Sequence, residues 1–149
     1  MRAVVQRVTQ ASVSVDGDVK GKIGQGLMVL IGVEEGDTAA DLRYIADKVP
    51  NLRIFRDEND KMNRSLLDIG GEILAISQFT LLGDARGGRR PSFITAARPE
   101  TADPMYEQLV ADWRGRGIRV DTGVFGADMQ VSLVNNGPVT ILLDSRKLF

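Results

Sequence analysis

MRAVVQRVTQASVSVDGDVKGKI, residues 1–23, is the stretch that decides the fold. It begins with a Val-rich segment, and Val favours strands because its branched side chain packs well on a pleated surface. Asp16-Gly17 is a dipeptide typical of the tight turn in a β-hairpin, so we expect the first segment to pair with Val19–Ile23. After the Gly24-Gln25-Gly26 break, the apolar run Leu27–Val33 is short enough to favour a third, buried strand over a helix.

Two segments carry the periodicity and end signals of helices. Thr38 and Asp41 are spaced as a capping box at the start of an amphipathic stretch, and Pro50 is expected to end that helix. Asp103-Pro104 predicts the start of the second helix, because Asp is a good N-cap and Pro is tolerated at the first helical position.

The remaining apolar segments are strand candidates: Leu52–Phe55, Glu72–Leu82, Ile118–Asp121, Met129–Asn135 and Val139–Asp144. A turn through Gly137-Pro138 is expected to join the last two. With two helices among about eight strand candidates, strict βαβ alternation fails. We therefore expect an α+β fold, a single domain over residues 1–149, built on a mostly antiparallel, barrel-like β-sheet.

Absent residue types narrow the possible chemistry. The chain has no His and no Cys, which excludes Ser-His-Asp and Cys-His sites, zinc helices of the HExxH type and disulfides. No serine has a lysine three positions further on, as a Ser-Lys nucleophile requires. The acidic turn Asp57–Asp60 is best interpreted as a solvated turn, so we expect no metal and no cofactor.

Charge and hydropathy bear on the partners. Lys and Arg number 19 against 20 Asp and Glu, so any contact with nucleic acid must be local. Two arginine groups are candidates for holding phosphates, and for each a solvated surface is an equally good interpretation: Arg86, Arg89 and Arg90, and Arg114, Arg116 and Arg119. Without a signal-peptide run or a stretch of ~18 apolar residues, we expect a cytoplasmic protein with no membrane contact.

Polar residues interrupt apolar strands in two places. Ser77-Gln78-Phe79-Thr80-Leu81 offers hydroxyls, an amide and backbone N–H groups, and Asn136-Gly137-Pro138-Val139-Thr140 is rich in turn residues. Taken singly, they are read as a strand end and a hairpin turn. In chain order with GRRPSF (Gly88–Phe93) and FGADM (Phe125–Met129), however, they closely resemble the D-aminoacyl-tRNA deacylases. The resemblance covers essentially the whole chain and includes the MRAVVQRV start and the segment Leu52–Leu66.

The resemblance implies a homodimer that hydrolyses the ester between a D-amino acid, or glycine, and the 3'-terminal ribose of tRNA. It also implies that Gly137-Pro138 forms a cis peptide that reaches into the partner subunit's pocket and rejects L-amino acids. Arg7 and Met129 are expected to support this site. Asn136 departs from the Asp common in the family, which keeps the size of the side chain and removes its charge.

The resemblance places Thr80 at the pocket, and its neighbours Ser77, Gln78 and Phe79 are the further candidates for the catalytic site. Of the two arginine groups, Arg86, Arg89 and Arg90 are our candidates for the contact with tRNA. A threonine hydroxyl is a poor nucleophile without an adjacent base, so we expect Thr80 to act by hydrogen bonding. An aminoacyl ester is already activated, so backbone N–H groups and the neighbouring ribose hydroxyl are expected to suffice. The alternatives are a non-catalytic RNA-binding module and a small hydrolase that uses Thr80 directly.

Overall fold

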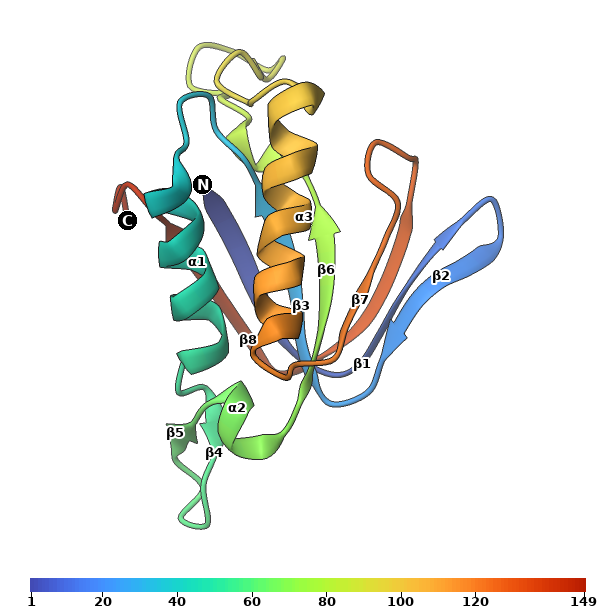
Figure 1. The fold of residues 1–149 in the computed structure, drawn as a ribbon, viewed down its shortest axis with the longest axis vertical. Coiled ribbons are helices and arrows are strands. Elements are labelled where there is room, and N and C mark those ends of the chain that lie inside the picture. The colour runs from blue at the N-terminus through green and yellow to red at the C-terminus, as the bar shows by residue number, and fades with distance from the viewer.

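The computed structural model describes residues 1–149 and is organised around a curled, barrel-like mixed sheet with helices on one side (Figure 1). Its strands are β1 (Arg2–Val15), β2 (Asp18–Ile23), β3 (Gly26–Gly32), β6 (Glu72–Ser77), β7 (Val120–Thr122) and β8 (Gln130–Asp144). β1 is central and pairs antiparallel with β2, β3 and β8. β3 pairs with β6, and β6 with β7, in parallel. The α+β, mostly antiparallel prediction is confirmed.

The first hairpin forms where the sequence predicted it. Asp16 and Gly17 have positive φ values of 51° and 84°, which suit the turn between β1 and β2. Along the first half of β1, every second residue, from Ala3 to Val5 to Arg7, is buried. The alternation places one face of β1 on the core. It also carries Arg7, a charged residue, into the interior.

Two long helices cover the sheet side by side (Figure 1). They are α1 (Ala39–Asn51) and α3 (Pro99–Gly115); α2 (Leu66–Ile69) is a single turn, and a small second sheet contains β4 (Phe55–Arg56) and β5 (Met62–Arg64). Trp113 of α3 is fully buried, and its indole N–H donates to the Ala46 carbonyl of α1 at 3.2 Å. Burying both the apolar ring and its polar N–H with a partner fixes the helices against each other.

The helix ends differ in detail from the predictions. The capping box of Thr38 and Asp41 is present, but Pro50 lies inside the last turn of α1, which continues to Asn51. The predicted start of the second helix at Asp103-Pro104 was wrong, because α3 begins at Pro99 and includes Pro104. Pro99 takes the first position, where a missing N–H costs nothing, and the interior Pro104 is tolerated because the helix buries an apolar face on both sides of it.

Two predicted strands were also wrong in extent. The segment predicted as Glu72–Leu82 leaves the sheet after Ser77 and continues as the 3-10 helix η1 (Phe79–Leu82). Of Leu52–Phe55, only Phe55 is in a strand. Because a single apolar run can serve a strand and the turn that follows it, periodicity did not separate them.

The expected turn between two C-terminal strands does not exist, because β8 runs continuously from Gln130 to Asp144 beside β1. Asn135 pairs with Val8 and Thr140 with Gln6, so the four residues between Asn135 and Thr140 lie opposite Arg7 alone. This arrangement is a large β-bulge, and bulges re-aim residues near functional sites. The turn residues predicted to reverse the chain here push it out of the sheet instead.

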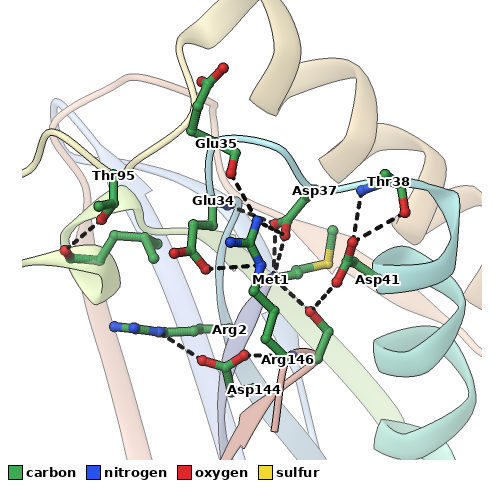
Figure 2. Close-up of polar contacts among 12 residues, drawn as sticks. Met1, Arg2, Glu34, Glu35, Asp37, Thr38, Asp41, Thr95, Asp144 and Arg146 are labelled. Atoms are coloured by element: carbon green, nitrogen blue, oxygen red, sulfur yellow. Dashed lines mark hydrogen bonds and ion pairs between the residues drawn. The ribbon is translucent and has the colours of Figure 1, made fainter. Parts of the chain in front are cut away.

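Polar contacts join the two ends of the chain beside the start of α1 (Figure 2). The Met1 ammonium lies 2.8 Å from the Asp37 carboxylate and donates to the Ser145 hydroxyl at 2.7 Å. Ser145 in turn donates to Asp41 at 2.7 Å. Burial acts to raise the pKa of Asp41, but hydrogen bonds from Thr38 and Ser145 and the Met1 charge outweigh it and hold that pKa below its ordinary value.

Candidate functional site

A cavity of about 720 Å³ opens between the C-terminal end of β6, the start of α3 and the segment that leads into β8. Its wall is mostly apolar, and its polar side chains come from the end of β6 and η1, and from Asp128 before β8. The lining residues are Ile31, Val33, Ile76, Ser77, Gln78, Phe79, Thr80, Phe93, Ala96, Ala97, Pro99, Ala102, Phe125, Gly126, Ala127, Asp128, Met129 and Val131. A concave, largely apolar cavity with a few convergent polar groups is the usual form of a small-molecule site.

Five residues predicted for the site meet in this cavity: Ser77, Gln78, Phe79, Thr80 and Met129. The Gln78 backbone N–H donates to the Ile31 carbonyl at 2.7 Å, which ties the end of β6 to β3. Its side-chain amide donates to the Thr80 hydroxyl at 3.0 Å. The turn into η1 therefore holds an amide and a hydroxyl side by side at the cavity wall.

The polar groups of the cavity are one carboxyl group, one side-chain amide, two hydroxyls and the backbone. Asp128 is the one ionisable side chain among the lining residues. The Thr80 hydroxyl accepts a hydrogen bond from the NH₂ group of the Gln78 side chain, and this donor group cannot take a proton from the hydroxyl. The arrangement suits positioning and dipolar stabilisation of an activated substrate better than attack by a protein nucleophile.

The other predicted site lies on the β8 bulge. Gly137 and Pro138 are exposed, and the peptide bond between them is cis. Beneath them, Arg7 donates from Nε to the Asn136 carbonyl at 3.0 Å and from Nη1 to the Ile54 carbonyl at 2.7 Å. Arg7 is 3% exposed and bonds to these carbonyls without a carboxylate partner within salt-bridge distance. Burial, and then the nearby positive charge of Arg56, lower the pKa of Arg7.

Two neighbouring asparagines contribute to the bulge, Asn135 through its side chain and Asn136 through its backbone. The Asn135 carboxamide accepts from the Val139 N–H at 2.9 Å and donates to the Thr140 hydroxyl at 3.1 Å, which closes the loop from inside. Asn136, where the resemblance leads us to expect Asp, is exposed and holds Arg7 through its backbone carbonyl alone. Because that contact is made by the backbone, an Asp at this position would make it equally well.

The two predicted sites do not meet within one chain. Gly137, Pro138 and Arg7 line a separate hollow of about 440 Å³ together with residues of the β4–β5 turn, and it shares no lining residue with the 720 Å³ cavity. In Figure 1 β6 ends in the upper half of the molecule, whereas the β4–β5 hairpin lies at the lower end.

The arginines divide into paired and unpaired ones. Arg86 forms a bidentate contact with Asp84 at 2.9 and 2.7 Å, which holds the pKa of that carboxyl far below its ordinary value. Arg89 and Arg90 are exposed and form no ion pair in the structure. In the second group, Arg116 pairs with Asp47 and Asp112, Arg119 pairs with Glu72 and Asp121, and Arg114 donates to the Val120 carbonyl. Arg89 and Arg90 in the first group, and Arg114 in the second, are therefore exposed cations without a carboxylate partner.

Several residues of the cavity were missed by sequence reasoning. Phe93, Phe125 and Asp128 belong to the motifs GRRPSF and FGADM, so the signal was present, although only Met129 was assigned to the site. Pro99 and Ala102 come from the first turn of α3, which the sequence placed outside the helix. Nothing local distinguishes a small apolar residue of a cavity wall from one of the core.

Comparisons with known proteins agree with one another. A profile of the D-Tyr-tRNA(Tyr) deacylase family matches residues 4–144. The chain is 63% identical to a D-aminoacyl-tRNA deacylase of Desulfitobacterium hafniense and 59% identical to one of Halothermothrix orenii, each over 100% of both chains. A solved structure titled c-Myc DNA Unwinding Element Binding Protein superposes with a TM-score of 0.91 at 42% identity, over 97% of this chain and 98% of that one. A probable eukaryotic D-amino acid tRNA deacylase shares the fold, with a TM-score of 0.81 at 21% identity over 96% of this chain and 98% of that one.

Proposed function

Because this chain belongs to the D-Tyr-tRNA(Tyr) deacylase family and is a hydrolase of the D-aminoacyl-tRNA deacylase type, we propose that it releases D-amino acids and glycine from tRNA as a homodimer. The deacylase activity is supported by the match to D-aminoacyl-tRNA deacylases over their whole length. The proposal of a shared active site rests on one observation: within one chain, the exposed Gly137-Pro138 tip and the cavity at Gln78–Thr80 belong to separate hollows. In a dimer, the tip of each subunit completes the cavity of the other.

Chirality is read by exclusion. A proofreader has to accept many D side chains and spare every L side chain, which attractive recognition at about 1–3 kcal/mol per methylene does not achieve. Main-chain carbonyls of Gly137 and Pro138, placed against the α-carbon of the substrate, collide with an L side chain and leave a D side chain free. Glycine carries only hydrogen at that position and passes. Rejection of the wrong substrate by a clash is a general source of specificity.

The bulge is built to present this tip in one position. Arg7 holds the Asn136 carbonyl from below, and Asn135 holds Val139 from the other side. A residue whose side chain is buried and hydrogen-bonded is a better support than a solvated one, because packing removes its alternative rotamers. Arg7 is thus a positioning residue for the tip rather than a group that touches the ester.

Hydrolysis needs little help because the aminoacyl ester is already activated. We assign the stabilisation of the developing oxyanion to backbone N–H groups at Phe79 and Thr80, with the Thr80 hydroxyl and the Gln78 amide orienting the substrate. The ribose 2'-hydroxyl beside the ester takes part in activating water. Replacing that hydroxyl by hydrogen is expected to abolish turnover while binding is kept, and turnover at an undiminished rate would exclude this step.

A mixed dimer tests whether the site is shared between subunits. One subunit carries a broken tip, Gly137→Ala, and the other a blocked cavity, Ala127→Trp; Ala127 lines the cavity and is absent from the tip. The Gly137→Ala dimer has two open cavities with altered tips and is expected to release both enantiomers, whereas the Ala127→Trp dimer has two blocked cavities. In the mixed dimer the single open cavity meets the intact tip of the other subunit, so we expect D-tyrosine release at about half of the wild-type value per dimer and no release of L-tyrosine. Mixed dimers that also release L-tyrosine would show that each chain uses its own tip.

The rival functions make different predictions. A non-catalytic RNA-binding module binds charged tRNA and releases neither enantiomer. A hydrolase that attacks through Thr80 loses activity in Thr80→Val, whereas the hydrogen-bonding role proposed for Thr80 predicts a loss of about tenfold, typical of one hydrogen bond in the transition state. Complete loss in a folded Thr80→Val dimer would favour the nucleophile.

A further inference from the structure

Two aromatic rings stand at the rim of the cavity. Phe79 opens η1 and Phe93 closes the loop that follows it, and both side chains line the cavity. They remain 55% and 37% exposed, respectively, with ring centroids 5.3 Å apart and planes inclined by 73°. An edge-to-face pair that is this exposed keeps part of its ring surface accessible to a ligand.

The loop that carries Phe93 is tied down. The backbone N–H of Asp84 donates to the Ser92 carbonyl, and the N–H of Ser92 donates to the Asp84 carbonyl, each at 2.8 Å. These two hydrogen bonds close the loop at its base. A Cβ added at Gly83 would lie 3.0 Å from Cε1 of Phe93, so the missing side chain at Gly83 gives the ring its place. The ring is therefore held at the rim before any ligand arrives.

The same loop carries two of the unpaired cations described above. Arg86 is neutralised by Asp84, whereas Arg89 and Arg90 project without a carboxylate partner just before Phe93 in the sequence. Open aromatic faces next to free cations are the combination by which proteins bind single-stranded nucleic acid, since bases stack on rings and phosphates meet the charges. A solvated loop over a core has no need of either feature.

We propose that Phe93, supported by the edge contact with Phe79, stacks the base of the penultimate nucleotide of the tRNA, while Arg89 and Arg90 hold the phosphates on its 5' side. This inference rests on the proposed deacylase function. The ester and the terminal nucleoside enter the cavity, so the next base lies at the rim, between the cavity and the two arginines. Phe93 is thereby a positioning residue that directs the single strand into the cavity.

Short acceptor-stem RNAs charged with D-tyrosine test the stack when the penultimate base is either intact or removed as an abasic nucleotide. With intact RNA, Phe93→Ala is expected to lower kcat/KM about tenfold, mainly through KM, in line with the alanine effects typical of base stacking. Removing the base lowers the wild-type value about tenfold and leaves Phe93→Ala unchanged, because the partner of the base is already gone. Phe93→Trp keeps a stacking ring and retains most of the activity.

Controls separate stacking from a structural role. Ile94→Ala changes the neighbouring side chain, which is 88% exposed and outside the cavity, and is expected to act as wild type. Replacing Arg89 or Arg90 by Ser reduces the salt dependence of binding by about one phosphate contact each. Arg43→Ser, an exposed cation on α1, leaves it unchanged.

Three results would overturn the inference. If the abasic RNA slows wild type and Phe93→Ala by the same factor, the base does not contact Phe93. If Phe93→Ala is fully active, the ring does not position the strand. A wild-type protein that releases no D-tyrosine from the intact RNA refutes the proposed function itself and the inference with it, whereas normal release without coupling refutes the stack alone.

Discussion

Replacing Gly137 by Ala tests the tip of the bulge most sharply. Gly137 has a φ of +131°, and an added Cβ would lie 2.8 Å from Cγ2 of Val139, 3.0 Å from Nη2 of Arg7 and 3.2 Å from the Val139 nitrogen. That backbone region costs a residue with a side chain on the order of 1–3 kcal/mol, and overpacking adds about 1–3 kcal/mol. We expect Gly137→Ala to lower the free energy of unfolding by about 3 kcal/mol.

Two other glycines serve as matched controls. Gly117 has a φ of +85° and nothing within 4 Å of an added Cβ, so Gly117→Ala carries the backbone cost of about 1–2 kcal/mol without the contacts. Gly115, at the end of α3, has neither a positive φ nor a close neighbour, and Gly115→Ala is expected to be neutral or slightly stabilising. Urea unfolding of the three variants separates the two parts of the effect.

The functional readout is the ratio of D-tyrosine to L-tyrosine release from matched tRNAs. Because the tip has to move away from Arg7 and Val139 to admit the methyl group, we expect Gly137→Ala to lose discrimination, while the two control variants keep it. The reasoning is refuted if Gly137→Ala unfolds at the same urea concentration as Gly117→Ala and discriminates like wild type.

Further predictions concern the buried charges. Arg7→Met leaves two carbonyls without their donor, so we expect a loss of about 2 kcal/mol in unfolding free energy and weaker rejection of L-tyrosyl-tRNA; full stability with full selectivity would contradict the supporting role. Asp37→Ala leaves the buried Met1 ammonium without its carboxylate partner, and we expect it to lower the unfolding free energy, measured in urea, by about 3 kcal/mol. A loss under about 1 kcal/mol would argue against a stabilising role for this ion pair. Because the folded-state pKa of Asp41 is depressed, its ionised carboxylate stabilises the fold above about pH 4, and this stabilisation is lost as the pH falls through the folded-state pKa. The difference in unfolding free energy between wild type and Asp41→Asn should therefore become smaller below about pH 4. A difference that does not change with pH would exclude the ionised contact.

The fold was predictable where local signals agree with tertiary structure. The Asp16-Gly17 turn and the Thr38 capping box each depend on neighbours in the sequence, and both form as expected. The segment around Gly137 does not form the predicted turn, although its residues are typical of turns. Whether such residues reverse a chain or bulge it depends on pairing with β1, a contact between residues more than 120 positions apart, which no local pattern contains.

The site was predictable as a set of motifs and not as an arrangement. The resemblance named Thr80 and Gly137 together, yet within one chain they line different hollows. Composition limits the chemistry independently of the fold, because a chain without His and Cys cannot form a site built on an imidazole or a thiol. The distinction between the paired Arg86 and the unpaired Arg89 depends on the side chain of Asp84, whose bidentate geometry only the folded loop reveals.

Release of tyrosine from tRNA charged with either enantiomer is the most direct test of chiral proofreading. The wild-type protein is incubated with D-tyrosyl-tRNA and with L-tyrosyl-tRNA at equal concentrations, and free tyrosine is measured over time. The account predicts rapid release of the D-enantiomer and no release of the L-enantiomer above the rate of spontaneous hydrolysis. Equal rates for the two enantiomers would contradict it.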